Sequence, residues 1–187
     1  MNFIETYDNA LTKEQCNTIV SWFEEQNHKI KGLTYNGEGQ RTVDKSFKSD
    51  IEIPETHLSQ DILPSQLIYP ALCDGIEKYR QKYISSIDTM SPWRLIDGYN
   101  LQKYDGEEDG FKKWHCESAG LSSCHRMLAW MIYLNNAKSG TEFVHYRTVR
   151  PKTGRLVIWP SSWTHVHRSQ LPNRGLKYIA TGWCAFI

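Results

Sequence analysis

The chain has 187 residues, a length that predicts a single domain able to enclose a ligand pocket beside a buried core. Its formal net charge is only +1, which gives no reason to expect nucleic acid or a membrane as a partner. Residues 1–6 lack the basic and apolar stretches of a signal peptide, and no run of about 18 apolar residues follows. We therefore expect a soluble, cytoplasmic protein.

Cysteine usage excludes two further classes of protein. The five cysteines form no C-x-x-C pair, which argues against a structural zinc site, and their odd number argues against a disulfide framework. We expect them to be reduced, mostly buried thiols. Seven Trp and ten Tyr residues suit a core that is rich in β-sheet.

The first predicted element is a helix over residues 12–27. Thr12 and Gln15 have the spacing of a capping box, in which each side chain accepts a hydrogen bond from the backbone N–H of the other residue. Apolar residues then recur with the helical period at Cys16, Ile19, Val20 and Phe23. This stripe predicts a helix that packs one face against the core.

The segment that follows, residues 27–40, is polar and contains three glycines, so we predict a loop. It could be a flap over a functional site or an ordinary surface connection, and the second interpretation is favoured. Residues 42–53 end in an alternating stretch before a proline, which predicts an edge strand. A second helix is predicted from Pro64 or Pro70 to Ile84, on the helical spacing of Leu72, Ile76, Tyr79 and Tyr83.

From residue 93 onward the pattern changes to short strands separated by turn residues, as in a sandwich or barrel. Strands are predicted at residues 93–104, 111–117, 126–134, 141–146, 155–159, 164–168 and 176–186. Helices that come first and strands that come afterwards indicate the α+β class.

One short motif in this region suggests metal binding. His115 and Glu117 are two residues apart, so in a strand both side chains point to one face and Cys116 points to the other. The same spacing also fits an ordinary strand with one solvated face. A third ligand could come from His165 or His167, and periodicity does not choose between them because a strand would present both on the same side. Two histidines and one carboxylate form the facial triad of non-haem Fe(II) sites.

A set of further motifs surrounds this one in a consistent order. They are Tyr104, Trp114-His115-Cys116-Glu117, Arg126, Ile132-Tyr133-Leu134-Asn135, Gly140-Thr141-Glu142-Phe143, Pro151-Lys152-Thr153-Gly154, Trp163-Thr164-His165-Val166-His167-Arg168 and Lys177-Tyr178-Ile179-Ala180-Thr181-Gly182-Trp183. In order and spacing, residues 95–187 resemble the Fe(II)/2-oxoglutarate-dependent oxygenases of the prolyl 4-hydroxylase-like group. The resemblance implies a double-stranded β-helix, or jelly roll, with supporting N-terminal helices. It places one dioxygenase domain over residues 1–187, with a helical part over about 1–90 and a jelly-roll core over about 91–187.

The resemblance also implies which residues hold the metal and the cosubstrate. Lys177 matches the basic residue that pairs with the distal carboxylate of 2-oxoglutarate, and it follows His167 by ten positions and His165 by twelve. The shorter spacing is typical of the group, so His115, Glu117 and His167 are expected to bind Fe(II), with His165 nearby. Glu117 stands where the group more often has Asp.

Four more residues of the pocket follow from the same resemblance. Tyr133 is expected to donate to the distal carboxylate, Tyr104 to approach the cosubstrate and Trp183 to line the pocket floor. Arg126 is expected either to contact substrate or to hold a loop. Each tyrosine could equally be a core ring whose hydroxyl lies at the mouth of a barrel.

The implied activity is hydroxylation of an unactivated C–H bond with Fe(II), 2-oxoglutarate and molecular oxygen, with ascorbate as a candidate reductant. The favoured substrate is a prolyl residue in a peptide or protein, over which the polar segments 31–40 and 105–110 could close. The alternatives are a free amino acid or other small molecule, or a non-catalytic jelly-roll module that only binds a ligand.

Overall fold

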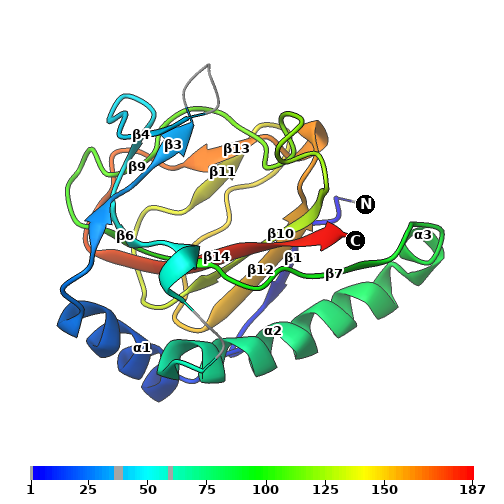
Figure 1. Cartoon of the computed structure of the whole chain (residues 1–187), viewed down its shortest axis with the longest axis horizontal. Coiled ribbons are helices and arrows are strands. Elements are labelled where there is room, and N and C mark those ends of the chain that lie inside the picture. Colours follow the sequence, from blue (N-terminus) through cyan, green and yellow to red (C-terminus); the bar gives the residue numbers. More distant parts are fainter. Residues whose placement is uncertain (1, 36–39, 59–60) are drawn as a thin grey trace.

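The computed structural model describes residues 2–35, 40–58 and 61–187. Within these residues eight strands form one antiparallel sheet, in the order β1-β12-β10-β14-β8-β6-β2, with β7 paired to the far end of β14. The strands are β1 (Glu5–Tyr7), β2 (Ile30–Lys31), β6 (Ile51–Ile53), β7 (Trp93–Leu95), β8 (Asn100–Tyr104), β10 (Arg126–Tyr133), β12 (Arg155–Pro160) and β14 (Lys177–Phe186). Strand β14 runs through the middle of this main sheet (Figure 1).

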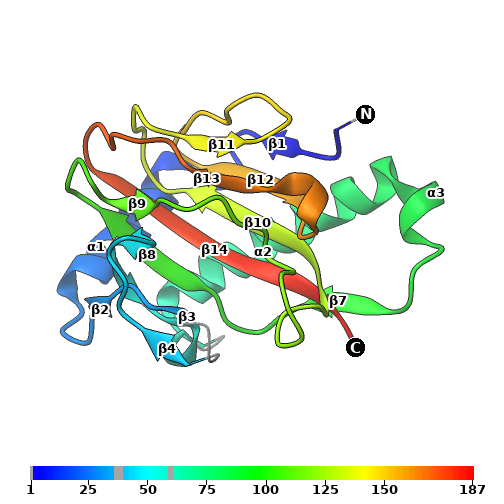
Figure 2. The ribbon, with the colours of Figure 1, turned by 90° about the horizontal axis from the view of Figure 1, so that it is seen from above.

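Short strand pairs lie over one face of the main sheet (Figure 2). They are β3 (Thr34–Tyr35) with β4 (Arg41–Thr42), β5 (Lys48–Ser49) with β9 (Gly110–Phe111), and β11 (Thr141–Phe143) with β13 (His167–Ser169). The main sheet and these pairs form the two walls of a jelly roll, as predicted, and the α+β class is confirmed.

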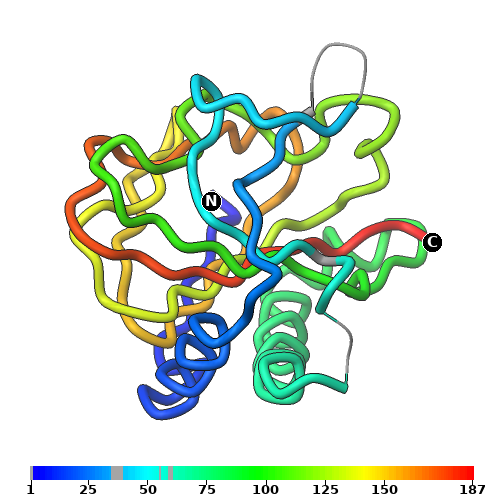
Figure 3. Tube along the Cα trace, turned by 60° about the vertical axis from the view of Figure 1, so that its left-hand side comes forward, coloured from blue at the N-terminus to red at the C-terminus, as the bar shows by residue number. Residues whose placement is uncertain are grey.

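Helices cover the other face of the main sheet, and Figure 3 shows them together on that side. They are α1 (Lys13–Glu25), α2 (Leu63–Lys82) and the short α3 (Ile84–Ile87), and there are two 3-10 turns, Glu55–His57 and Trp163–His165. The predicted capping box of α1 is present, because Thr12 Oγ1 accepts from Gln15 N at 3.1 Å and Gln15 Oε1 accepts from Thr12 N at 2.8 Å. Pro64 lies in the first turn of α2, and Pro70 lies inside the helix.

Side chains of the main sheet alternate between two apolar clusters. In β10, Leu128, Trp130 and Ile132 pack toward the helices, whereas Ala129, Met131 and Tyr133 face the interior of the jelly roll. Both faces of the strand are therefore buried, which explains why its sequence is almost continuously apolar. We call the second side the inner face, and the predicted site residues lie on or near it.

The structure corrects four of the predicted elements. The strand predicted at 111–117 is wrong over most of its length, because β9 ends at Phe111 and His115 makes only an isolated bridge. The strand predicted at 164–168 is wrong in its first half, because a 3-10 turn occupies Trp163–His165 and β13 begins only at His167. Strand β6 is not an edge strand, since it pairs with both β8 and β2. The predicted loop 27–40 contains β2 and β3, and its residues 36–39 lie outside the described part of the chain.

Two simpler expectations concern the whole chain. All five cysteines are free thiols, as predicted, but the expectation that most are buried is wrong, because only Cys16 and Cys184 are buried. In the described ranges, no helix has the length and apolar character needed to cross a membrane.

The turn at Gly154 gives a test of the fold. Its φ is +75°, and an added Cβ would lie 1.9 Å from the backbone oxygen of Leu11. Gly154→Ala should lower the free energy of unfolding by about 2–5 kcal/mol, because left-handed backbone strain adds to a clash with rigid backbone. In urea denaturation, Gly120→Ala is the control and should change stability by about 0.5 kcal/mol or less, since nothing lies within 4 Å of its added Cβ. Equal stability of the two variants would contradict this account.

Candidate metal centre and cosubstrate pocket

His115, Glu117 and His167 converge on one point. One ligand atom from each residue lies within 4.8 Å of the other two. Glu117 Oε1 is 3.6 Å from His115 Nε2 and 3.4 Å from His167 Nε2. All three side chains are largely buried, with exposed fractions of 14%, 17% and 7%.

Backbone pairing brings the two histidines together. His115 and His167 form an isolated antiparallel bridge, in which N–H of His115 donates to the His167 oxygen at 3.0 Å and the reverse bond is 2.9 Å. Residues directly opposite in such a pair point to the same face. After His115 the chain leaves the wall formed by the short strand pairs. Glu117 N donates to Ser161 O, at the end of β12, at 3.0 Å. The carboxylate is thereby positioned between the two walls.

The hydrogen bonds of both imidazoles leave Nε2 free to bind a metal. His115 Nδ1 lies 2.9 Å from Lys113 O, and His167 Nδ1 lies 2.9 Å from His165 O. A carbonyl oxygen can only accept, so each Nδ1 carries the proton and each Nε2 has a lone pair directed at the shared point. This donor set of two neutral imidazoles and one carboxylate fits Fe(II).

Titration behaviour agrees with this donor set. Burial alone would raise the pKa of Glu117, but hydrogen bonds and charge interactions with His115 and His167 hold that pKa well below its usual range. Burial, together with the charge of His115, lowers the pKa of His167. An ionised carboxylate and a neutral imidazole are the forms that bind a metal ion.

His165 is held in a different environment. Its Nε2 lies 2.8 Å from Asn2 O, and its Nδ1 lies 2.9 Å from Thr164 Oγ1, so both ring nitrogens have hydrogen-bond partners. Its ring stacks on Tyr146 at a centroid distance of 5.1 Å. Because the 3-10 turn interrupts the strand, His165 and His167 do not share a face as the sequence suggested. Cys116 is also outside the cluster of ligand atoms, as predicted.

Lys177 places a buried ammonium on the inner face. The residue is 3% exposed, and burial lowers its pKa to about 8. Among the described residues its Nζ makes one hydrogen bond, to Ser139 O at 3.5 Å, and it lies 4.6 Å from the centre of the Tyr104 ring. A buried ammonium without an ion-pair partner is costly, so this position suits an anionic ligand.

The two predicted tyrosines are completely enclosed and hydrogen-bonded. Tyr133 Oη lies 2.8 Å from Thr141 Oγ1, and the hydroxyl of Tyr104 donates to Gln102 Oε1 at 2.7 Å. Both rings belong to the same inner cluster as Phe143 and Trp159, whose rings contact His167. The inner cluster therefore links the ammonium region to the metal-ligand group.

Two polar members of this pocket were missed in the sequence. Thr141 stands within one of the motifs that carry the resemblance, and Gln102 lies two residues before Tyr104 on the same face of β8. Alternation along β8 was the available signal for Gln102, since it places this side chain on the same face as Tyr104.

Trp183 and Arg126 lie at the metal-ligand group. Trp183 Nε1 donates to Glu117 Oε2 at 2.8 Å, and Arg126 Nη1 lies 3.4 Å from the same oxygen. The Arg126 guanidinium stacks over the Trp183 ring at 3.6 Å. Trp183 was expected to line a pocket floor, and its hydrogen bond to Glu117 was not foreseen.

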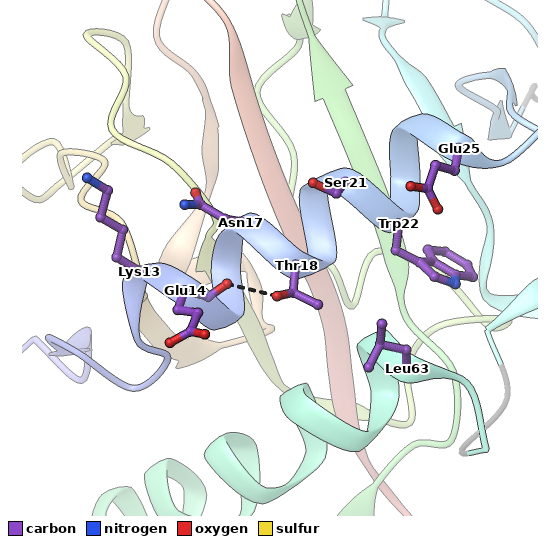
Figure 4. A pocket seen from close by; sticks show the side chains of 8 residues that line it. All are labelled: Lys13, Glu14, Asn17, Thr18, Ser21, Trp22, Glu25 and Leu63. Carbon is purple, nitrogen blue, oxygen red and sulfur yellow. Dashed lines mark hydrogen bonds between the residues drawn. The ribbon is translucent and has the colours of Figure 1, made fainter.

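One surface depression lies away from this group, along α1. Figure 4 shows side chains from the outer side of α1 and from Leu63 around it, with Thr18 Oγ1 donating to Glu14 O at 3.0 Å. None of the described residues that line it is a histidine or cysteine. Among the described residues, the group that could hold a metal ion is His115, Glu117 and His167, and none of these lines the depression.

Comparisons with known proteins agree with the geometry. A sequence model of the 2OG-Fe(II) oxygenase superfamily matches residues 99–185. No curated protein matches the sequence.

Several solved structures share the fold. A prolyl-4-hydroxylase from Pseudomonas putida has a TM-score of 0.68 at 15% identity, over 100% of this chain and 94% of its own. A prolyl hydroxylase from Trichoplax adhaerens, in complex with a hypoxia inducible factor oxygen degradation domain peptide fragment, has a TM-score of 0.70 at 12% identity, over 99% and 84%. SnoN, a non-heme alpha ketoglutarate dependent epimerase from nogalamycin biosynthesis, has a TM-score of 0.65 at 11% identity, over 99% and 78%.

The matched residues 99–185 include all the residues predicted to bind metal, cosubstrate and substrate, and the surrounding strands form the expected jelly roll. Over residues 99–185 the chain is similar to the 2OG-Fe(II) oxygenase superfamily, and the whole chain shares its fold with solved prolyl hydroxylases.

Proposed function

We propose that this protein hydroxylates a C–H bond, with Fe(II) held by His115, Glu117 and His167 and 2-oxoglutarate anchored by Lys177. The observation that carries the proposal is the convergence of two free Nε2 atoms and a carboxylate oxygen, in the same jelly-roll interior as an ammonium that has no ion-pair partner among the described residues. Strands β1, β2 and β6 pair into the same sheet as the C-terminal strands, which supports one domain over residues 1–187.

With Fe(II), 2-oxoglutarate and molecular oxygen present, such a centre would supply oxidative decarboxylation of 2-oxoglutarate to succinate and carbon dioxide, in which one atom of the oxygen molecule enters succinate and the other enters the substrate as a hydroxyl. The protein's own contribution is binding, orientation and exclusion of water. Lys177 neutralises the distal carboxylate in the buried interior, and the Tyr133–Thr141 hydroxyl pair offers polar contacts there. The aromatic rings of Phe111, Phe143 and Trp159 restrict the two imidazoles and keep water from the centre.

The choice of histidine is directly testable. His167→Ala should weaken Mn(II) binding by more than about 100-fold and abolish turnover, because a direct ligand contributes more than the outer contacts that cost about 10–100-fold when removed. His165→Ala is the matched control and should retain metal binding and a measurable rate. Metal affinity from the electron paramagnetic resonance signal of free Mn(II) checks both variants, and the reverse ranking would assign the ligand to His165.

The role of Lys177 has a pH signature as well as a mutational one. Lys177→Ala should weaken 2-oxoglutarate binding by about 30-fold or more, since truncating one partner of a buried charge pair costs roughly 2–5 kcal/mol. In the wild type the lowered pKa of about 8 implies that affinity falls as pH rises above that value, because the neutral amine must take up a proton to pair with the carboxylate.

Lys177→Arg is the control for the pH effect. Its guanidinium stays charged throughout this range, so affinity for 2-oxoglutarate should not fall as pH rises, although the larger group fits the pocket less well. Calorimetric titration of the Mn(II)-loaded protein with 2-oxoglutarate at several pH values measures all three proteins. Unchanged affinity in Lys177→Ala would exclude Lys177 as the anchor.

For the substrate, we propose a prolyl residue within an extended peptide segment. Two neighbours in fold are prolyl hydroxylases, one of them bound to a peptide. An X-Pro segment is already biased toward an extended backbone, which lowers the entropy lost on binding. The acidic turn 105–109 is a weaker receptor for a free basic amino acid than its charge suggests. Asp109 already accepts hydrogen bonds from Ser49 Oγ and from the backbone of Asp105 and Gly106.

The substrate class is tested by incubating the enzyme with proline-containing peptides or with free amino acids, in the presence of Fe(II), 2-oxoglutarate and ascorbate. We expect succinate to accumulate with peptides, and tandem mass spectrometry to locate one added oxygen on proline. Hydroxylation of a free amino acid without any peptide product would favour the small-molecule alternative. Metal and 2-oxoglutarate binding without turnover of either class would favour the binding-module alternative.

A further inference from the structure

We propose that Trp183 and Arg126 are positioning residues for Glu117, which hold one carboxylate oxygen so that only the other is presented to the metal. This inference rests on the metal centre proposed above. It assigns both residues to the metal carboxylate, whereas the sequence suggested pocket lining for Trp183 and substrate or loop contact for Arg126.

The two oxygens of Glu117 have separate sets of neighbours. Oε1 faces the Nε2 atoms of His115 and His167, at 3.6 Å and 3.4 Å. Oε2 accepts from Trp183 Nε1 at 2.8 Å and lies 3.4 Å from Arg126 Nη1. A carboxylate whose second oxygen is engaged in this way binds a metal through one atom, which leaves more coordination positions open for ligands.

Arg126 is placed by an irregularity in β10. It pairs with Ala185, but Leu128 pairs with Cys184, so one extra residue interrupts the register between them. Such a bulge redirects a side chain, and here the guanidinium lies flat on the Trp183 ring at 3.6 Å. Arg126 Nη1 also donates to the backbone oxygen of Glu117 at 3.4 Å, so it holds both the main chain and the side chain of that residue.

The contacts of Trp183 and Arg126 with Oε2 suit a glutamate in particular. Glu has one more rotatable bond than Asp, so it loses more side-chain entropy when it is fixed in a single geometry. A donor from β14 and a cation from β10 restrict that freedom before the metal arrives. The contacts to Oε2 are therefore expected to contribute to metal affinity and not only to fold stability.

The decisive variant is Trp183→Phe, which keeps an aromatic ring beneath Arg126 and removes the N–H donor. Mn(II) affinity should fall by about 10–100-fold, the usual effect of deleting a partner of a metal ligand. Trp130→Phe is the matched control. Trp130 is fully buried, whereas Trp183 is partly buried. Trp130 lies beside Gly182 on the neighbouring strand, but it faces the helices and its Nε1 has no hydrogen-bond partner among the described residues. Its substitution should lower thermal stability and leave Mn(II) affinity within about twofold.

A double-mutant cycle with Glu117→Asp separates positioning from general packing. The Asp side chain is one methylene shorter, so its carboxylate cannot contact both the metal and Trp183 Nε1. In the Glu117→Asp background, Trp183→Phe should therefore cause little further loss of Mn(II) affinity. Non-additivity of this kind is expected for residues that act through one contact. An equal loss in both backgrounds would overturn the inference.

Failure of this inference is distinguishable from failure of the proposed metal centre. If wild-type protein binds Mn(II) and Trp183→Phe binds it equally well, the positioning role is wrong and the metal centre stands. If wild-type protein binds no Mn(II), the metal centre itself is wrong and the positioning role falls with it. Circular dichroism of each variant verifies that the affinities compare folded proteins.

Discussion

The site depends on one backbone contact, the antiparallel bridge between His115 and His167. Its two hydrogen bonds place both imidazoles on the same side of the short-stranded wall, and neighbouring carbonyls then fix both tautomers. Glu117 can complete the group only because the chain crosses from this wall to the end of β12 within two residues. A shift of this pairing by one residue would turn one imidazole away from the other.

The charged side chains buried in the interior of the jelly roll are a second constraint on the structure. Lys48 lies between Glu52 and Asp50, and burial still raises the pKa of Asp50 to about 7 despite Lys48 Nζ at 3.4 Å. Gln102 continues this network from Glu52 to the hydroxyl of Tyr104. Lys177, on the next strand, makes no ion pair within the described residues. Because an unpaired interior charge is costly, the protein is expected to become more stable when an anionic cosubstrate binds there.

The sequence by itself determined the structural features that depend only on residues close together in the chain. The capping box begins α1, because Thr12 and Gln15 lie within hydrogen-bonding reach along the chain. Turn residues bounded the predicted strands 126–134 and 176–186, which correspond to the central strands β10 and β14. The His-x-Glu spacing proposed two metal ligands by strand alternation, although only His115 has a strand-like pairing in the structure. Resemblance of the motif set was needed to suggest the cosubstrate pocket.

Only the tertiary structure decided how distant segments meet. A 3-10 turn, which strand alternation does not predict, gives His165 an environment different from that of His167. The structure also pairs β6 with β8 and adds β2 at the edge of the same sheet. Trp183 reaches Glu117 across 66 positions of sequence, and Arg126 reaches the same carboxylate through a bulge in β10. Register, bulges and contacts of this kind follow from the packing of whole walls against each other, so no local period in the sequence encodes them.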